Sequence, residues 1–246
     1  MITSYHRPQT LDEALTLLAQ PNMVPLGGGT LLAQHKADPV EAVDLQALGL
    51  NTIKKRGNNL EIGATVTLQQ LLESEHCPEA LKSALKLEAP LNVRNAATVA
   101  GTLVACDGRS TFAATLLALD VKLTTIVNRQ PSVVSLGEFL PLRPRGLITS
   151  MTIPLNVKLA FDYVSRTPAD KPIVCAALAQ WNSGRTRLAL GGYGKSPLLG
   201  MDGTEAEGVE AAALNAFHEA ADEWASAEYR MDIAAILAKR CLGNSS

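Results

Sequence analysis

The sequence predicts an α+β protein in which a larger N-terminal part, residues 1–155, precedes a smaller C-terminal part, residues 156–246. Three observations support this prediction. Apolar residues make up 47% of the 246 residues, which is enough to build a substantial core. Up to Pro154 the chain contains both strand-like and helix-like segments. Beyond it, three strand-like segments precede two helix-like segments, which indicates a separate antiparallel α+β unit.

The first segments predict a helix, a strand and a glycine turn. Thr10 is a suitable N-cap for a helix over residues 10–19, where apolar residues recur at helical spacing. Residues 23–26 are a short apolar run of strand type. Three glycines at 27–29 follow, and Thr30 can cap a further helix whose first turns cover residues 31–35.

A strand, a glycine turn and a helix start, taken together, are suited to binding an anion. Glycine has no Cβ, so a ligand can approach the backbone closely. The N–H groups at a helix start point to one place and carry partial positive charge, which suits a phosphate or pyrophosphate. A mobile glycine turn without a ligand fits these residues equally well. The spacing is neither that of a Walker A loop nor that of a GxGxxG fingerprint.

The middle of the chain predicts a hairpin followed by helices. The turn residues 57–59 separate strand-like segments at 53–56 and 60–63. Thr67 and Pro78 are suitable starts for two helices. The segments expected up to residue 155 are short strands over 42–45, 120–127 and 147–153, helices over 68–74, 79–88 and 112–119, and a short helix or turn over 135–140.

The C-terminal part predicts a small sheet covered by helices. A turn at 182–184 joins the second and third of its strands. The expected segments are strands over 160–165, 173–181 and 185–193, a loop over 194–203, and helices over 206–221 and 226–241.

A second glycine-containing stretch, residues 92–103, is small, polar and without clear periodicity. It predicts a loop that is rich in backbone N–H groups, which could lie beneath a ligand. On the residues alone, an ordinary buried loop is the stronger interpretation.

These segments, in this order, resemble the flavin-binding medium subunit of the molybdenum hydroxylases, the family of xanthine dehydrogenase and carbon monoxide dehydrogenase. Residues 26–32, LGGGTLL, look like the family's GGGTDLL, and residues 94–103, RNAATVAGTL, look like its RN-x-ATIGGNL. Further similarities are IGA-x-x-T at 61–67, LLALDA at 116–120, R-x-ALGG at 187–192 and the closing helix at 229–242. Each match is short, but the ordered set covers nearly the whole chain.

The resemblance implies a two-lobed FAD-binding domain followed by a small C-terminal antiparallel sheet with helices. Its lobes are expected at about 1–55, a small α/β lobe, and 56–155, a mixed-sheet lobe. The implied cofactor is FAD, held by two loops under the pyrophosphate and adenosine and by aliphatic side chains against the rings. The residues that the resemblance assigns to cofactor binding are Pro25, Leu26, Gly27, Gly28, Gly29, Thr30, Leu31, Leu32, Ala97, Thr98, Gly101, Thr102, Val104, Ser110, Leu147 and Ile148.

Several positions depart from the family pattern. Leu31 replaces the usual acid, Ala100 replaces a glycine, and Thr102 replaces an asparagine. Residues 108–111, GRST, replace the family's P-x-SD and keep only Ser110. These departures leave a degenerate, flavin-free structural subunit of the same kind of complex as the alternative. If the site is intact, a side chain added at a loop glycine such as Gly28 is expected to fill the pyrophosphate space.

The resemblance implies an oxidoreductase subunit that transfers electrons. An iron–sulfur small subunit would reduce the flavin, and a molybdopterin-binding large subunit would oxidise the substrate. The flavin would then reduce NAD, a quinone or oxygen. Flavin chemistry requires no protein nucleophile or acid–base pair, so no catalytic residue is predicted. The four cysteines lack cluster spacing, so no metal site is predicted and the chain should not oxidise a substrate alone.

The bulk properties exclude other classes of protein. A net charge of −2 and a pI near 6.1 argue against nucleic acid as a main partner. No apolar run approaches the length of a membrane span. Scattered cysteines and an N-terminus without signal-peptide character predict a cytoplasmic protein.

Overall fold

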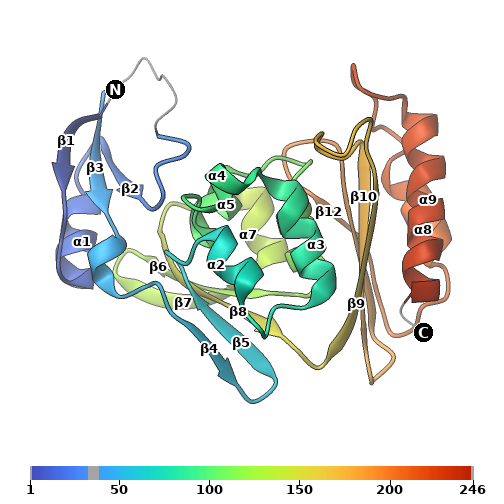
Figure 1. Ribbon diagram of the computed structural model, residues 1–246, viewed down its shortest axis with the longest axis horizontal. Coiled ribbons are helices and arrows are strands. Elements are labelled where there is room, and N and C mark those ends of the chain that lie inside the picture. Colours follow the sequence, from blue (N-terminus) through green and yellow to red (C-terminus); the bar gives the residue numbers. More distant parts are fainter. Residues whose placement is uncertain (1, 33–38, 245–246) are drawn as a thin grey trace.

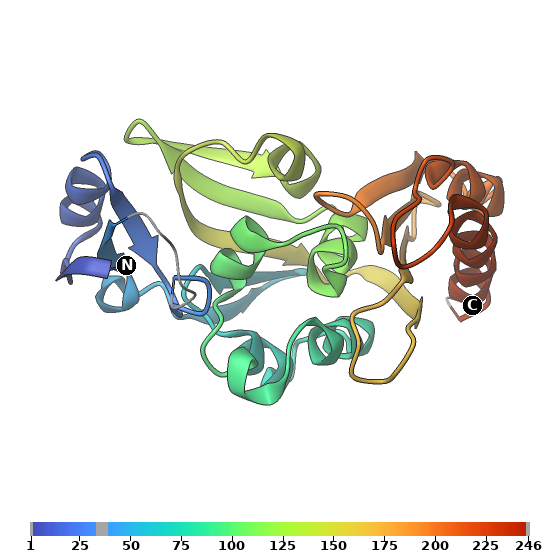
Figure 2. The ribbon, with the colours of Figure 1, turned by 90° about the horizontal axis from the view of Figure 1, so that it is seen from above.

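The computed structural model of the protein describes residues 2–32 and 39–244. The described residues form three sheets that lie one after another along the longest axis of the molecule (Figure 1). Seen from above, the N-terminal lobe and the C-terminal helices stand at opposite ends of the molecule (Figure 2). Helices and sheets are largely segregated, and the predicted α+β class is confirmed.

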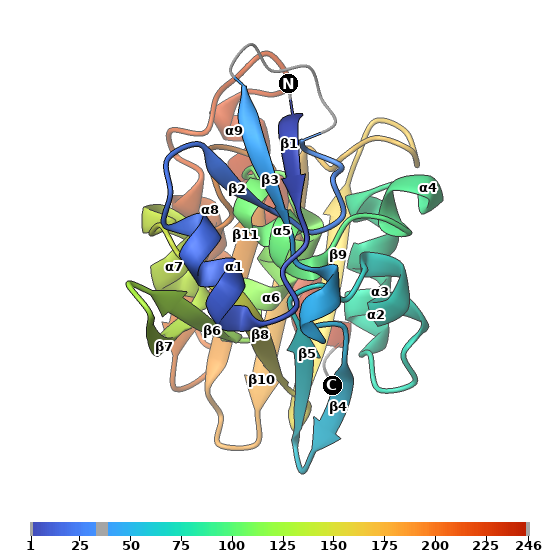
Figure 3. The same cartoon turned by 90° about the vertical axis from the view of Figure 1, so that its left-hand side faces the viewer.

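The first sheet forms the core of a small lobe together with one helix. Figure 3 shows this lobe facing the viewer. Its strands pair in parallel in the order β1-β3-β2, so Pro25 falls on an edge strand, where a missing N–H is tolerated. Thr10 and Glu13 form a capping box that starts the helix, as predicted. The elements are β1 (Ile2–His6), α1 (Leu11–Leu18), β2 (Met23–Leu26) and β3 (Val40–Asp44).

The second sheet has five strands in the order β4-β5-β8-β6-β7. All of its neighbouring strands are antiparallel, where a mixed sheet was expected, because two of the pairs are simple hairpins and β8 returns between them. Strand β7 was not predicted; it is an exposed edge strand that contains Pro131. The strands are β4 (Ile53–Arg56), β5 (Asn59–Gly63), β6 (Lys122–Val127), β7 (Gln130–Ser135) and β8 (Leu147–Pro154).

Helices cover one side of this sheet and fill the space up to the third sheet (Figure 1). Every residue of α6 is buried, because α6 packs against α3 on one side and against β10 and β11 on another. The stretch 92–103, expected to be a loop, instead contributes two short helices, α4 and α5. The helices are α2 (Leu68–Glu73), α3 (Glu79–Glu88), α4 (Leu91–Arg94), α5 (Val99–Ala105), α6 (Thr111–Ala118) and α7 (Leu136–Leu142).

The third sheet is antiparallel, in the order β12-β11-β10-β9, and two helices cover its outer face (Figure 1). Alternate residues of β10 explain why both faces are buried: Ala177 and Ala179 join the core around α6, whereas Ala176 and Leu178 join the core under α8 and α9. The segment 194–203 was expected to be a loop, but it contains β12. The elements are β9 (Val157–Val164), β10 (Val174–Trp181), β11 (Thr186–Gly191), β12 (Leu198–Gly203), α8 (Val209–Ala216) and α9 (Ala227–Asn244).

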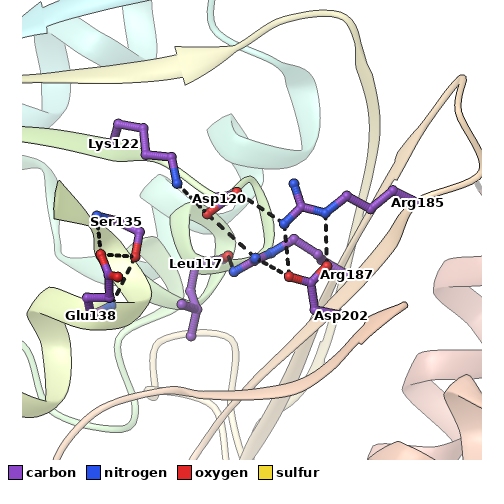
Figure 4. Close-up of polar contacts among 8 residues, drawn as sticks. All are labelled: Leu117, Asp120, Lys122, Ser135, Glu138, Arg185, Arg187 and Asp202. Atoms are coloured by element: carbon purple, nitrogen blue, oxygen red, sulfur yellow. Dashed lines mark hydrogen bonds and ion pairs between the residues drawn. The ribbon is translucent and has the colours of Figure 1, made fainter. Parts of the chain in front are cut away.

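A network of charged side chains joins the third sheet to the end of α6 (Figure 4). Arg187 on β11 is buried, and its Nη1 lies 2.6 Å from Asp202 Oδ2 and 3.5 Å from Asp120 Oδ1. Arg185 donates to both Asp202 oxygens, at 2.9 and 2.8 Å, and to Asp120 at 3.1 Å. The hydrogen bonds from Arg185 hold the pKa of Asp202 below its usual range.

Candidate functional site

A cavity of about 590 Å³ opens between the small lobe, helix α5 and strand β8. The structure brings both glycine-containing stretches to its wall. The sequence-predicted site residues that line it are Pro25, Gly27, Gly28, Gly29, Thr30, Leu31, Leu32, Ala97, Thr98, Gly101, Thr102, Val104, Leu147 and Ile148. Leu26 and Ser110 are not among the lining residues.

Two glycines of the first loop allow it to pack directly against the second stretch. A Cβ atom built on Gly28 would lie 1.6 Å from the carbonyl oxygen of Ala96. A Cβ on Gly27 would lie 2.6 Å from Thr98 Oγ1. The expectation that a side chain at Gly28 would fill ligand space is therefore wrong, because that side chain would collide with the neighbouring backbone and separate the two loops.

The two loops present different chemistry to the cavity. Among the described residues, no acceptor is found for the N–H groups of residues 27–30. In the second stretch, by contrast, Val99 N–H donates to Val66, Ala100 N–H to Ala64, and Gly101 N–H to Thr98 Oγ1. Within the described part of the chain, the N–H groups of the first loop are therefore available to a ligand, whereas the second stretch offers a wall of small side chains.

The helix expected over residues 31–35 falls only partly within the described residues. Leu31 and Leu32 lie in a turn, and residues 33–35 fall outside the described residues. Part of the wall is aliphatic: Leu147 and Ile148 on β8 are buried and line the cavity. Such a wall suits the face of a planar ring where aromatic side chains are scarce.

Ser110 has a different role from the one that the resemblance assigned to it. It is fully buried, caps α6 by accepting from Ala113 N–H, and donates to Glu88 Oε2 at 2.8 Å. Phe112 N–H donates to the same carboxylate oxygen at 3.0 Å. Glu88 thus occupies the N-terminus of α6, where a phosphate could otherwise bind.

The sequence reasoning missed several residues that line the cavity. Thr65 is buried, and its Oγ1 has no hydrogen-bond partner among the described residues. Cys106 is also buried, which raises the pKa of its thiol to about 11, so the thiol stays protonated at neutral pH. Glu88 and Lys171 are the charged side chains among the described lining residues. Thr65 lies within the segment 61–67 that carries the resemblance, but nothing in sequence spacing predicts where Glu88 and Lys171 lie.

Comparison with known proteins identifies the family of the chain. A family model described as the FAD binding domain in molybdopterin dehydrogenase matches residues 1–156. The chain belongs to this family. Its cofactor is therefore FAD, and the predicted relationship to the molybdenum hydroxylase flavoprotein subunits is confirmed.

The relatives extend over most of the chain. An uncharacterized protein of Escherichia coli strain K12, YgfM, is 30% identical over 246 residues, which cover 96% of this chain and 94% of the relative. A putative xanthine dehydrogenase FAD-binding subunit of the same strain, XdhB, is 29% identical over 79% of this chain and 75% of its own length. A chain of reconstituted CO dehydrogenase from Oligotropha carboxidovorans has the same fold, with a TM-score of 0.85 at 23% identity and coverage of 98% and 96%.

The cavity fits FAD in three respects. The N–H groups of residues 27–30, which have no acceptor among the described residues, suit a pyrophosphate, and the aliphatic residues of β8 suit a flat ring. The unpartnered hydroxyl of Thr65 is a buried polar group that a ligand could satisfy. Neither an acid at position 31 nor a glycine at position 100 is needed for these features.

The described residues contain no helix that is long and apolar enough to cross a membrane. Within the same residues, no group of three or more histidine, cysteine, aspartate or glutamate side chains could hold a metal ion.

Proposed function

We propose that this chain is the FAD-carrying electron-transfer subunit of a multi-subunit molybdenum hydroxylase. The observation that carries the proposal is the cavity between the small lobe and α5, where free N–H donors, an aliphatic wall and an unpartnered threonine hydroxyl meet. The family match over residues 1–156 supports FAD as the occupant.

In this proposal the chain binds and orients the cofactor rather than reacting itself. FAD supplies a carrier that accepts and releases electrons. Residues 27–30 hold the pyrophosphate through backbone N–H groups, and Leu147 and Ile148 pack against a ring. Thr65 donates or accepts one hydrogen bond. The other assigned residues, from Ala97 to Val104, shape the wall of the cavity, and Leu26 ends the strand that leads into the loop.

The electron donor in the proposal is a small subunit with iron–sulfur clusters, and a large molybdopterin-binding subunit oxidises the substrate. The names of the relatives support this assembly, since one is a putative FAD-binding subunit of xanthine dehydrogenase and another belongs to CO dehydrogenase. NAD, a quinone or oxygen accepts the electrons. We further propose a cytoplasmic location, an FAD-binding domain at 1–155 with lobes at 1–55 and 56–155, and a C-terminal domain at 156–246.

One observation favours the alternative of a flavin-free structural subunit. Ser110, the residue kept from the family's P-x-SD segment, is bonded to Glu88 and is not among the residues that line the cavity. A chain that had lost its cofactor could keep the fold and the partners while the binding groups became engaged with one another.

Reconstitution distinguishes the two functions. The chain is purified with and without the proposed iron–sulfur and molybdenum subunits, and flavin absorbance is followed after substrate is added. Electron transfer predicts bleaching of the flavin only when all three subunits are present. Turnover of a purine, an aldehyde or carbon monoxide by the isolated chain would contradict the proposal, and a stable complex without flavin would establish the alternative.

A further inference from the structure

Lys171 is the one cationic side chain among the described residues that line the cofactor cavity. It comes from the segment between β9 and β10, so the C-terminal sheet supplies a charge to a cavity otherwise built by the N-terminal part. Its ammonium group lies 3.5 Å from Asp107 Oδ1, and the two side chains are 42% and 55% exposed. An ion pair that is so exposed is weak, so Lys171 can turn from Asp107 to a ligand.

A stack of side chains fixes the backbone that carries Lys171. Arg109 donates from Nη2 to the carbonyl oxygen of Lys171 at 2.8 Å and from Nε to that of Pro172 at 3.2 Å. The guanidinium of Arg109 lies 4.4 Å from the ring centre of Trp224, and that of Arg166 lies 4.6 Å from the same centre. Two cation–π contacts on one indole hold this segment in place beside the cavity.

The position of Lys171 along the cavity indicates which part of FAD it faces. The free N–H donors of residues 27–30 lie beside Ala96 and Thr98, at the start of α5. Lys171 contacts Asp107, which follows the other end of this helix. Seven residues of helix separate the two ends, or about 10 Å at the ordinary rise per residue. A cofactor with its pyrophosphate at the donors therefore has one of its two ring systems, the adenine or the isoalloxazine, on the side of Lys171.

We propose that Lys171 stabilises the negative charge that the isoalloxazine ring gains on reduction, and thereby raises the reduction potential of the bound flavin. Two electrons from the iron–sulfur partner and one proton from solvent would leave a bound ring with one negative charge, which Lys171 would face. Glu88, the other charged lining residue, would oppose this charge, but its carboxylate is held by Ser110 Oγ and Phe112 N–H. The inference rests on the proposed function, because it requires FAD in this cavity.

Two quantities measured on the FAD-loaded full-length chain test the proposal. The first is the dissociation constant of oxidised FAD, and the second is the midpoint potential of the bound flavin in a dye-equilibrated reductive titration. Lys171→Met should leave the dissociation constant of oxidised FAD little changed and should lower the midpoint potential. If the affinity for reduced flavin falls tenfold more than the affinity for oxidised flavin, the midpoint potential of a two-electron couple falls by about 30 mV. Lys171→Arg should restore the potential, and Lys54→Met, an exposed lysine on β4, is the matched control.

A double-mutant cycle separates the charge from the scaffold that holds it. Arg109→Leu should lower the potential in the wild-type background, because the segment carrying Lys171 is released, but not in the Lys171→Met background. Weaker binding of oxidised FAD to Lys171→Met at an unchanged potential would overturn the proposal and place Lys171 at the pyrophosphate. A wild-type potential in flavin-loaded Lys171→Met would also overturn it. A wild-type chain that binds no FAD would overturn the proposed function as well.

Discussion

Gly28 and Gly57 both lie in turns, but the structure requires glycine there for different reasons. Gly57 has a φ of +57° with open space around it, so Gly57→Ala should cost about 1 kcal/mol of backbone strain. Gly28→Ala would place its Cβ 1.6 Å from the Ala96 carbonyl oxygen and force the two cavity loops apart. Urea denaturation and FAD titration should show a larger loss of stability for Gly28→Ala, and weaker FAD binding for that variant alone. Equal effects from the two variants would contradict this packing.

Removing the hydroxyl group of Thr65 tests whether FAD contacts this residue. Its buried Oγ1 has no partner among the described residues, so Thr65→Val should leave the stability of the FAD-free chain unchanged or slightly higher. With FAD bound, the same change should remove one hydrogen bond and weaken affinity by about 1 kcal/mol. Calorimetric titration measures this loss, and thermal unfolding of the FAD-free chain is the control. Unchanged affinity would show that Thr65 does not contact the cofactor.

At the scale of elements, local signals in the sequence predicted the starts of helices and the tight hairpins. Thr10 and Thr67 each cap a helix with a capping box, and the turn at Gly57 joins β4 to β5, all as expected. These features depend on residues that are only a few positions apart, so they can be predicted from the sequence.

Other elements could not be predicted, because their hydrogen-bond partners are distant in the chain. The sequence of β12 contains Gly200 and Gly203 and is typical of a loop. The segment is a strand because it pairs with β11. α5 is only seven residues long and contains Gly101, and its buried residues Val99, Ala100 and Leu103 pack against other elements. The cavity residues assigned by resemblance came together, but Glu88 and Lys171 approach the cavity only through tertiary packing.

The charged network between α6 and the third sheet should make stability depend on pH. The pKa of Asp202 is lowered in the folded state, chiefly by the hydrogen bonds from Arg185. Its contribution is therefore fully present above the ordinary aspartate pKa and is lost as pH falls through the lowered folded value. Asp202→Asn should cost about 2 kcal/mol at neutral pH, since buried Arg187 loses its shortest ionic contact.

Urea denaturation at several pH values measures this dependence. The stability gap between wild type and Asp202→Asn should close in acid. Glu61→Gln, which breaks the exposed pair with Arg56, is the control and should change stability little at any pH. A gap that stays constant into acid would rule out the carboxylate of Asp202 as its source.

At the scale of the whole molecule, FAD should join the small lobe to the rest of the chain and stabilise both. FAD at one hundred times its dissociation constant adds about 2.7 kcal/mol to the free energy of unfolding. For a chain of this size that is a rise in melting temperature of roughly 5–10 °C. Riboflavin, which lacks the pyrophosphate, should produce a much smaller rise, because residues 27–30 would then have no acceptor for their N–H groups. Equal rises with both compounds would exclude these residues as the pyrophosphate site.

The most direct test of the central claim is the amount of flavin released by acid from the chain after purification with its partner subunits. The proposed function predicts one FAD per chain, released without proteolysis because no covalent link is expected near Cys106. Protein that forms the complex but releases no FAD, and takes none up when FAD is supplied, would contradict the claim.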